Sequence, residues 1–321
     1  MKWKKLGQVF NPQKWDDGFH REWMNSHAQC TSTLIFDDFV RVYFSSRYPK
    51  DENNQSTSVT SFLELDRNNL KKILRVSNKP VLSLGDLGSF DENAIYPTSV
   101  IRHENSVRLY YAGWSRCKSV PFNTSIGMAI SNDEGVTFKR YSDGPIISSS
   151  TDEPFVISGP KIRKFENNWF LYYLAGKRWI NHNGKPEIIY KNKMATSLDG
   201  INWKKEKRDI LCDLLDENEC QAGPDVFELN GLYHMYFAYR EGLNFREQTG
   251  RGYKIGYATS VDKYNWTRKD KEAGIFYSEN GWDSTMHHYP HVFELDGDYY
   301  MIYNGNDFGK YGFGLAILEN D

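Results

Sequence analysis

Short apolar runs separated by polar turns recur five times along the chain. Each run starts at a proline or at the residue that takes its place, namely Thr31, Pro97, Pro160, Pro224 and Pro290, with spacings of 66, 63, 64 and 66 residues. Self-similarity at a fixed period is typical of radial or solenoid architectures, in which each repeat is one supersecondary unit. The repeat therefore has to be interpreted before any local pattern.

Within each unit the pattern predicts four antiparallel strands. The first is a short apolar run such as 99–101, the second is aromatic, as at 109–111, and the third carries small residues, as at 127–129. The pair Asn230-Gly231 separates two such runs, and Asn-Gly at this place favours a tight hairpin turn. Four strands repeated five times predict an all-β fold, the five-bladed β-propeller.

The two ends of the chain together complete the last unit. The fifth unit stops after its third strand, at 317–318, whereas residues 2–6 at the N-terminus are similar to residues 202–206 of a fourth strand. We therefore expect the N-terminal strand to close the ring beside residues 314–316, and the whole chain, 1–321, to form one propeller domain. Two stacked β-sandwich domains are an alternative, but no linker or break interrupts the repeat.

Composition narrows the possible partners and the location. The net charge is −2, which indicates no preference for nucleic acid or for a membrane surface, and the N-terminus has no apolar h-region. No stretch is long enough to span a bilayer. We therefore expect a cytoplasmic protein with no membrane insertion, and the sequence leaves the oligomeric state open.

Metal and cofactor sites are not indicated. The four cysteines show no metal-binding spacing and are expected to be buried thiols. The run 287–291 contains three histidines, but His288 and His291 would point to opposite faces of a strand. There is no phosphate loop and no dinucleotide fingerprint, so we expect neither a metal nor another cofactor.

A polar and acidic set of residues precedes the first strand of each unit, where the chain should reach the mouth of the central funnel. Recurring aspartates at such places often cap turns. The glutamates do not recur in strict register and are the better functional candidates, and Asp225 is the one carboxylate that directly follows a repeat proline. The candidates in this set are His27, Gln29, Asp91, Glu92, Glu153, Glu219, Asp225, Asp283 and His288.

A second set follows the aromatic second strands and is cationic. Arg47, Arg178 and Arg240 stand at equivalent places, and Trp114 and Asn304 complete the ring. Arginine binds carboxylate or phosphate through two parallel hydrogen bonds. If the three arginines converge they form an anion site, beside which Trp114 would stack on a sugar ring.

The repeat pattern resembles the five-bladed propeller glycosidases of the arabinanase, levansucrase and invertase superfamily, which includes glycoside hydrolase families 43, 32, 117 and 130. Residues 224–236 and 90–101 carry the resemblance. The chain looks closest to uncharacterised propeller glycosidase-like proteins found with bacterial surface-polysaccharide genes. With these it shares the segments at 26–29, 43–47 and 303–306.

The resemblance implies an enzyme that acts on a glycosidic bond. In family 43 an aspartate follows a proline on an inner strand, and Asp225 matches it; the glutamate of the family's Glu-Gly-Pro motif is absent, because Gly159 and Gly223 follow Ser158 and Ala222. Glu219-Cys220 is similar to the invertase Glu-Cys pair but lies further from its proline. The acid therefore stays open among Glu153, Glu219 and Glu92.

Three functions remain possible at this point. The first is cleavage or transfer of a glycosidic bond in an anionic sugar or one related to surface-polysaccharide biosynthesis, with a carbohydrate, sugar-phosphate or nucleotide-sugar ligand. The second is a sugar-binding propeller without catalysis, which the missing glutamate favours. The third is a glycosyl phosphorylase or transferase, which the arginines would suit because some family 130 members bind phosphate through basic residues. Fold alone does not decide among them.

Overall fold

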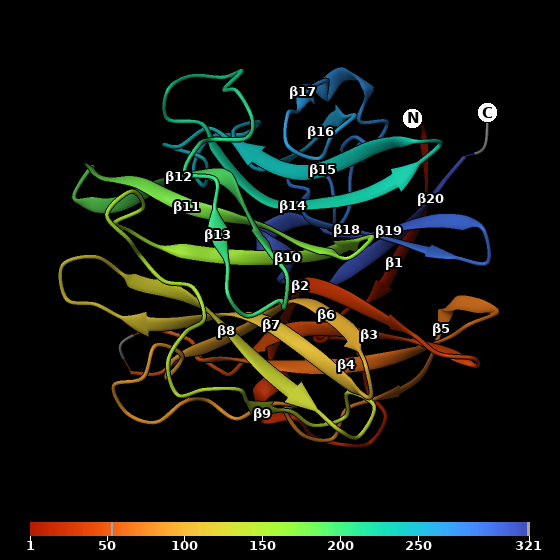
Figure 1. The fold of residues 1–321 in the computed structure, drawn as a ribbon. Coiled ribbons are helices and arrows are strands. Elements are labelled where there is room, and N and C mark those ends of the chain that lie inside the picture. Colours follow the sequence, from red (N-terminus) through yellow and green to blue (C-terminus); the bar gives the residue numbers. More distant parts are fainter. Residues whose placement is uncertain (53, 320–321) are drawn as a thin grey trace.

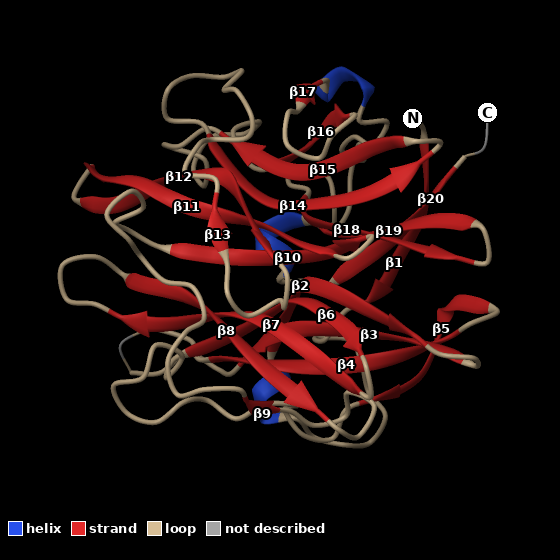
Figure 2. Ribbon diagram, in the orientation of Figure 1, coloured by secondary structure: helices blue, strands red, loops and turns tan. Residues whose placement is uncertain are grey.

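The computed structural model describes residues 1–52 and 54–319, and five four-stranded antiparallel blades make up nearly all of this part of the chain (Figures 1 and 2). The first two blades are β2 (Ser26–Ile35), β3 (Phe39–Arg47), β4 (Ser58–Asp66) and β5 (Asn69–Val76), then β6 (Ala94–His103), β7 (Ser106–Arg116), β8 (Phe122–Ser131) and β9 (Lys139–Arg140). The third and fourth are β10 (Ile157–Phe165), β11 (Asn168–His182), β12 (Lys185–Ser197) and β13 (Lys204–Lys205), then β14 (Cys220–Leu229), β15 (Leu232–Arg240), β16 (Lys254–Ser260) and β17 (Thr267–Arg268). The fifth is β18 (His288–Leu295), β19 (Asp298–Asn304), β20 (Phe313–Leu318) and β1 (Trp3–Phe10).

The inner strands form a ring, which confirms the predicted five-bladed propeller. β2 contacts β6, β6 contacts β10, β10 contacts β14, β14 contacts β18, and β18 returns to β2. Within the described residues, helical structure is limited to short turns at Glu22–Met24 and Asp270–Glu272 and to α1 (Asn306–Gly309) (Figure 2). No helix in the described residues has the length and apolar character needed to cross a membrane.

The N-terminal strand closes the ring, as the sequence predicts. β1 pairs antiparallel with β20, with Trp3 opposite Leu318 and Lys5 opposite Ala316, and it lies beside the C-terminal strand in Figure 1. The indole Nε1 of Trp3 donates a hydrogen bond to the Tyr236 hydroxyl of the fourth blade at 2.8 Å. The first strand of the chain therefore completes the last blade and also binds the blade before it.

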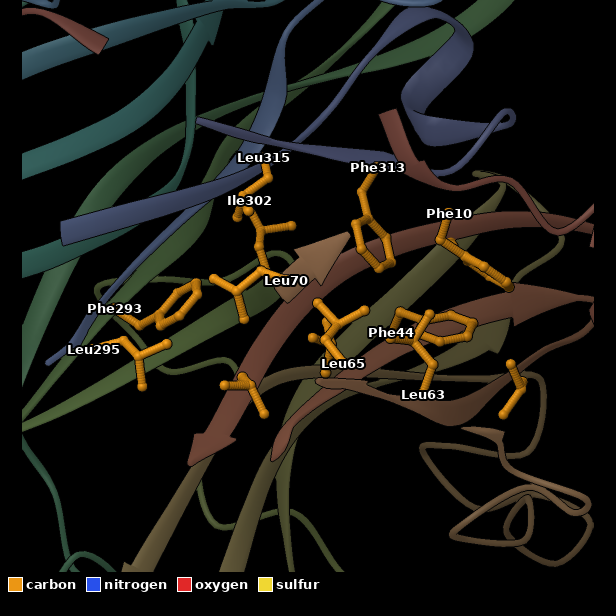
Figure 3. Packing of buried hydrophobic residues seen from close by; sticks show 14 of the residues in the cluster. Phe10, Phe44, Leu63, Leu65, Leu70, Phe293, Leu295, Ile302, Phe313 and Leu315 are labelled. Carbon is orange, nitrogen blue, oxygen red and sulfur yellow. The ribbon is translucent and has the colours of Figure 1, made fainter. Parts of the chain in front are cut away.

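Apolar packing fills the joint between the last blade and the first. Phe10 of β1 lies 5.2 Å from Phe44 of the first blade and 5.9 Å from Phe313 of the last, measured between ring centroids (Figure 3). All three side chains are buried. Burying each such ring contributes roughly 1.5–3 kcal/mol, so the joint is held mainly by the hydrophobic effect.

A buried ion pair ties the outermost strand to the start of the inner strand in four of the five blades. In each case the cation stands opposite an alanine of the third strand, as Lys5 stands opposite Ala316. The carboxylate belongs to the segment before the inner strand, and its side chain is at most 4% exposed. We call these pairs the clasps: Asp91–Arg140 at 2.9 Å, Glu153–Lys205 at 2.7 Å, Glu219–Arg268 at 2.5 Å and Asp283–Lys5 at 2.7 Å.

The clasps correct one expectation from the sequence. Glu153 and Glu219 occupy the same structural position as Asp91 and Asp283, so the idea that the glutamates fall outside the recurring acids is wrong. The equivalence is not visible in the sequence, because the number of residues between the carboxylate and the start of its inner strand differs from blade to blade. Breaking a buried pair leaves an uncompensated charge, so each clasp is a strong local constraint.

Removal of the cation from the last clasp should destabilise the fold. Lys5→Met leaves the Asp283 carboxylate without its ion-pair partner, so we expect a loss of about 1.5–3 kcal/mol in the free energy of unfolding, measured by urea denaturation. The neighbouring Lys4 is exposed and opposite Ile317. Lys4→Met is the matched control and should change the stability by less than about 0.5 kcal/mol. Equal effects of the two substitutions would show that the clasp does not stabilise the blade.

Candidate functional site

Five side chains at equivalent positions of the inner strands surround the propeller axis. Four of them accept a main-chain N–H from the inner strand of the following blade, as when Ser32 Oγ accepts from Val100 at 2.9 Å. Lysine has no acceptor atom, so Lys161 breaks the series and donates instead to the Thr31 carbonyl at 2.9 Å. We call these five the axial residues: Ser32, Ser99, Lys161, Asp225 and His291.

Asp225 is fully committed to the axial series. Its Oδ2 accepts from Val292 N at 2.9 Å and lies 2.8 Å from His291 Nδ1, while Oδ1 lies 2.5 Å from an Arg163 nitrogen. Burial opposes its negative charge, but Arg163 and Lys161 prevail and hold the pKa of Asp225 well below its usual value. Asp225, the candidate that matches the family 43 aspartate, is buried outside the cavity lining, and both of its carboxylate oxygens have partners.

The two other ionisable axial residues differ in their charge at neutral pH: His291 is neutral, and Lys161 is positively charged. Burial lowers the pKa of His291 to about 3, so its imidazole is neutral; Nε2 accepts from Thr33 N, and Nδ1 therefore carries the proton toward Asp225. Burial also lowers the pKa of Lys161 to about 8, although Asp225 opposes that shift. Lys161 is thus a buried cation at neutral pH, and it lines the cavity above.

A cavity of about 400 Å³ opens above the axial residues at one mouth of the funnel. Its lining comes from all five blades and contains four cationic side chains but a single carboxylate among the described residues, Glu187. An excess of cations in a partly enclosed space favours an anionic ligand, because the low-dielectric walls strengthen each charge interaction. The cationic residues are Arg47, Lys161, Arg240 and Arg246.

Arg47 and Arg240 are held in place by neighbouring groups. Arg47 donates to Gln29 Oε1 at 3.0 Å, and Arg240 donates to the Tyr190 hydroxyl at 3.1 Å and to the carbonyls of residues 241 and 242. The Nε atoms of both arginines are buried and have no hydrogen-bond partner among the described residues. Unsatisfied buried donors are costly. Both guanidinium groups line the cavity in fixed positions.

Arg178, unlike Arg47 and Arg240, does not line the cavity. Its side chain is 43% exposed, and it bonds to Asn218 Oδ1 at 2.8 Å rather than lining the cavity. A register shift in β11 between Gly176 and Arg178 turns the chain at this point. The structure thus brings two of the three arginines singled out in the sequence to one cavity.

Aromatic side chains form two walls of the cavity. On one side Trp114 packs on Phe122 with ring centroids 4.2 Å apart, and Phe122 meets Trp179 at 5.5 Å. On the other side His288 stacks on Tyr253 at 3.7 Å. Burial holds the pKa of His288 well below its usual value, so this imidazole is neutral. Flat apolar faces beside buried cations suit a ligand that is part sugar and part anion.

The remaining sequence candidates divide between the cavity and the surrounding framework. Gln29, Arg47, Trp114, Arg240 and His288 line the cavity. Glu92 accepts a main-chain bond from Gly88, and Asn304 donates to two main-chain carbonyls, of Ala28 and Gly312. Outside the lining lie His27, Asp91, Glu92, Glu153, Arg178, Glu219, Asp225, Asp283 and Asn304.

The sequence analysis missed three charged residues of the cavity. Lys161 follows Pro160 as Asp225 follows Pro224, so the same alignment could have found it. Glu187 comes from the extended β11–β12 hairpin, and Arg246 comes from the segment between β15 and β16. No repeat signal marks them. The described residues contain no cluster of three or more side chains suited to hold a metal ion.

Comparison with known proteins gives full-length relatives. The chain is 33% identical over 321 residues to the uncharacterised proteins MT1551 and Rv1502 of Mycobacterium tuberculosis, covering 100% of each. It is 25% identical over 255 residues to a 1,2-beta-oligomannan phosphorylase of Thermoanaerobacter sp., covering 77% of each chain. A beta-1,2-mannobiose phosphorylase of the same organism is 27% identical over 177 residues, which is 51% of this chain and 54% of that protein.

Solved structures agree with this fold. A glycoside hydrolase superposes with a TM-score of 0.76 at 17% identity, covering 99% of this chain and 92% of that one. A structure from the GH130 family of mannoside phosphorylases gives 0.68 at 13% identity, with 99% and 93% covered. No protein-family model matches the chain. The chain belongs to the family of the two Mycobacterium proteins. Its fold is that of the five-bladed propeller glycosidases, and its sequence is similar to those of the two mannoside phosphorylases.

Sulfate binding to the cavity should weaken as the pH rises through 8. Lys161, with its pKa lowered to about 8, loses its positive charge in this range, so the affinity for sulfate should fall up to about tenfold between pH 7 and 9. Titration calorimetry measures this directly, and sulfate keeps its own charge throughout.

The matched variant is Lys161→Arg, because arginine stays protonated over the same range. Its sulfate affinity should not depend on pH between 7 and 9. A wild-type affinity that does not change with pH, or an equal pH dependence in the two proteins, would mean that Lys161 does not contact the anion.

Proposed function

We propose that the protein transfers a glycosyl group from a carbohydrate to an anionic acceptor, and that inorganic phosphate is this acceptor. The protein would then be a glycoside phosphorylase. The observation that carries the proposal is the charge of the funnel cavity, where Arg47, Lys161, Arg240 and Arg246 face a single carboxylate, Glu187.

The number of carboxylates separates phosphorolysis from hydrolysis. Glycoside hydrolysis normally uses a pair of carboxylates, one as acid and one as base or nucleophile. The described lining has one, because Glu153 and Glu219 are in clasps and Asp225 is occupied on the axis. Phosphate is itself the nucleophile and needs cations to bind it. One acid and several cations are therefore the set that phosphorolysis requires.

The geometry of the arginines supports phosphate rather than water as the attacking group. Arginine offers planar, paired donors that match phosphate oxygens. Arg47 reaches the cavity from the first blade and Arg240 from the fourth, each fixed by its own partners, Gln29 and Tyr190. Donors held in place before binding lose little entropy when the anion arrives.

The aromatic walls support a sugar as the second part of the ligand. Trp114, Phe122 and Trp179 present adjacent rings along one side, and aromatic rings bury large apolar area with few rotatable bonds. The names of two relatives specify phosphorylases of β-1,2-linked mannosides, so these glycosides are the first substrates to test. An anionic sugar of surface-polysaccharide metabolism would use the same cations, and it belongs in the same panel.

Turnover should depend on phosphate. We expect purified protein, given β-1,2-mannobiose and a panel of other glycosides, to form a glycosyl phosphate, detected by ³¹P nuclear magnetic resonance, at a rate that rises with phosphate and then saturates. Equal release of free sugar without phosphate would contradict the proposal and indicate a hydrolase. Sugar binding without any turnover would contradict it in favour of a non-catalytic propeller.

The arginines provide a matched pair of variants. Arg47→Ala removes a charged hydrogen bond to the anion and should raise the KM for phosphate about 10- to 150-fold, the equivalent of about 1.5–3 kcal/mol. Arg178→Ala removes an arginine from the equivalent strand end but outside the cavity, so KM should stay within about twofold of wild type. An equal effect of the two substitutions would show that position in the cavity does not matter.

A further inference from the structure

The extended β11–β12 hairpin brings Glu187 to the cavity. β11 has 15 residues and β12 has 13, whereas no other described strand exceeds 11, and the extra length adds the pairs near the hairpin end, including Ile180 with Glu187. The Glu187 side chain is 15% exposed. It is the one carboxylate among the described lining residues, and it lies on the same hairpin as Trp179 of the aromatic wall.

Arg246 holds the Glu187 carboxylate. The two side chains form an ion pair, and Arg246 is 50% exposed, with its guanidinium 4.1 Å from the Phe245 ring centroid. Arg240 and Cys220 also interact electrostatically with Glu187. Next to Glu187 on the strand, Ile188 is buried and apolar.

We propose that Glu187 is the proton donor of the reaction, and that binding of the anion by Arg246 releases it for this role. The inference rests on the proposed function, since it concerns the same cavity. In the free protein Arg246 stabilises the charged carboxylate. When Arg246 turns to a bound phosphate, Glu187 loses this partner and faces the negative charge of the phosphate, and a nearby like charge favours the neutral acid.

The step balances with no further reactant. The bond between the anomeric carbon and the leaving oxygen breaks, and a bond from that carbon to a phosphate oxygen forms. Glu187 gives its proton to the leaving oxygen, and the resulting carboxylate takes up the proton of hydrogen phosphate. The products are a glycosyl phosphate dianion and the free sugar alcohol.

Leaving-group dependence is the first test. Glu187→Gln should lower kcat about 10²- to 10⁴-fold for an unactivated glycoside and much less for a dinitrophenyl glycoside, whose leaving oxygen needs no proton. The KM for phosphate should stay equal or fall, because Arg246 is no longer engaged. Arg246→Leu should have the opposite effect on these two constants: the KM for phosphate should rise, and kcat should change little.

Glu153→Gln is the comparison variant, because Glu153 is a buried glutamate that precedes the inner strand of the same blade and is paired with Lys205 in a clasp. It should lower stability and keep turnover per folded molecule. If Glu153→Gln loses kcat in the leaving-group-dependent way and Glu187→Gln does not, the assignment of Glu187 is overturned.

Proton uptake separates this inference from the proposed function. We expect sulfate binding at pH 6.5, measured by calorimetry in buffers of different ionisation enthalpy, to take up a proton in the wild type and measurably less in Glu187→Gln. Lys161 is already charged at this pH and adds little. Equal uptake in both proteins would overturn the release of Glu187 by the anion. A difference in proton uptake between the two proteins, without turnover of any glycoside, would support the release of Glu187 by the anion and contradict the proposed phosphorylase activity.

Discussion

Hydrogen bonds across the propeller axis are the constraint on which the rest of the structure depends. Each inner strand pairs within its blade along one side only, so main-chain N–H groups on its other side find no partner in their own blade. Ser32, Ser99, Asp225 and His291 supply the acceptors, each for the next blade. Buried N–H groups must be paired, so the identity of these residues fixes how the blades meet.

Lys161, the one axial residue that accepts no main-chain hydrogen bond, adds a positive charge to the cavity. Lys161 cannot accept a hydrogen bond. Its amino group donates instead to the Thr31 carbonyl, and its side chain lines the cavity. One blade thus gives up an axial acceptor and gains a buried cation. The clasps also contribute to the positive charge of the cavity. Glu153 and Glu219 are paired with cations inside the blades and do not line the cavity, which therefore has more cations than carboxylates.

The fold was predictable because its signals are local and repeated. Each of three signals specifies a strand or its partner: the apolar runs separated by polar turns, the hairpin turns such as 230–231, and the match of the N-terminus to 202–206. Arg47 and Arg240 were found for the same reason, since the strand register decides where the end of a second strand points. Arg178 was misplaced in the anion group because a bulge, invisible in the pattern, turns its strand.

The acids were not predictable from the repeat. Whether a glutamate is structural depends on a cation in the fourth strand, some 50 residues along the chain for Glu153 and Glu219, as the clasp contacts with Lys205 and Arg268 show. Glu187 and Arg246 lie in segments outside the repeat, where their approach is set by tertiary packing alone. The repeat pattern predicts the strands that all five blades have in common, whereas the cavity depends on residues found in single blades only.

The most direct test of the account is the position of an anion in crystals soaked with tungstate, whose electron-rich metal is unambiguous in anomalous maps. The account predicts one strong peak in the funnel cavity, with tungstate oxygens within hydrogen-bonding distance, about 3 Å, of Arg47, Lys161 or Arg240 side-chain nitrogens. A cavity without a peak, in crystals that bind tungstate elsewhere on the surface, would contradict it.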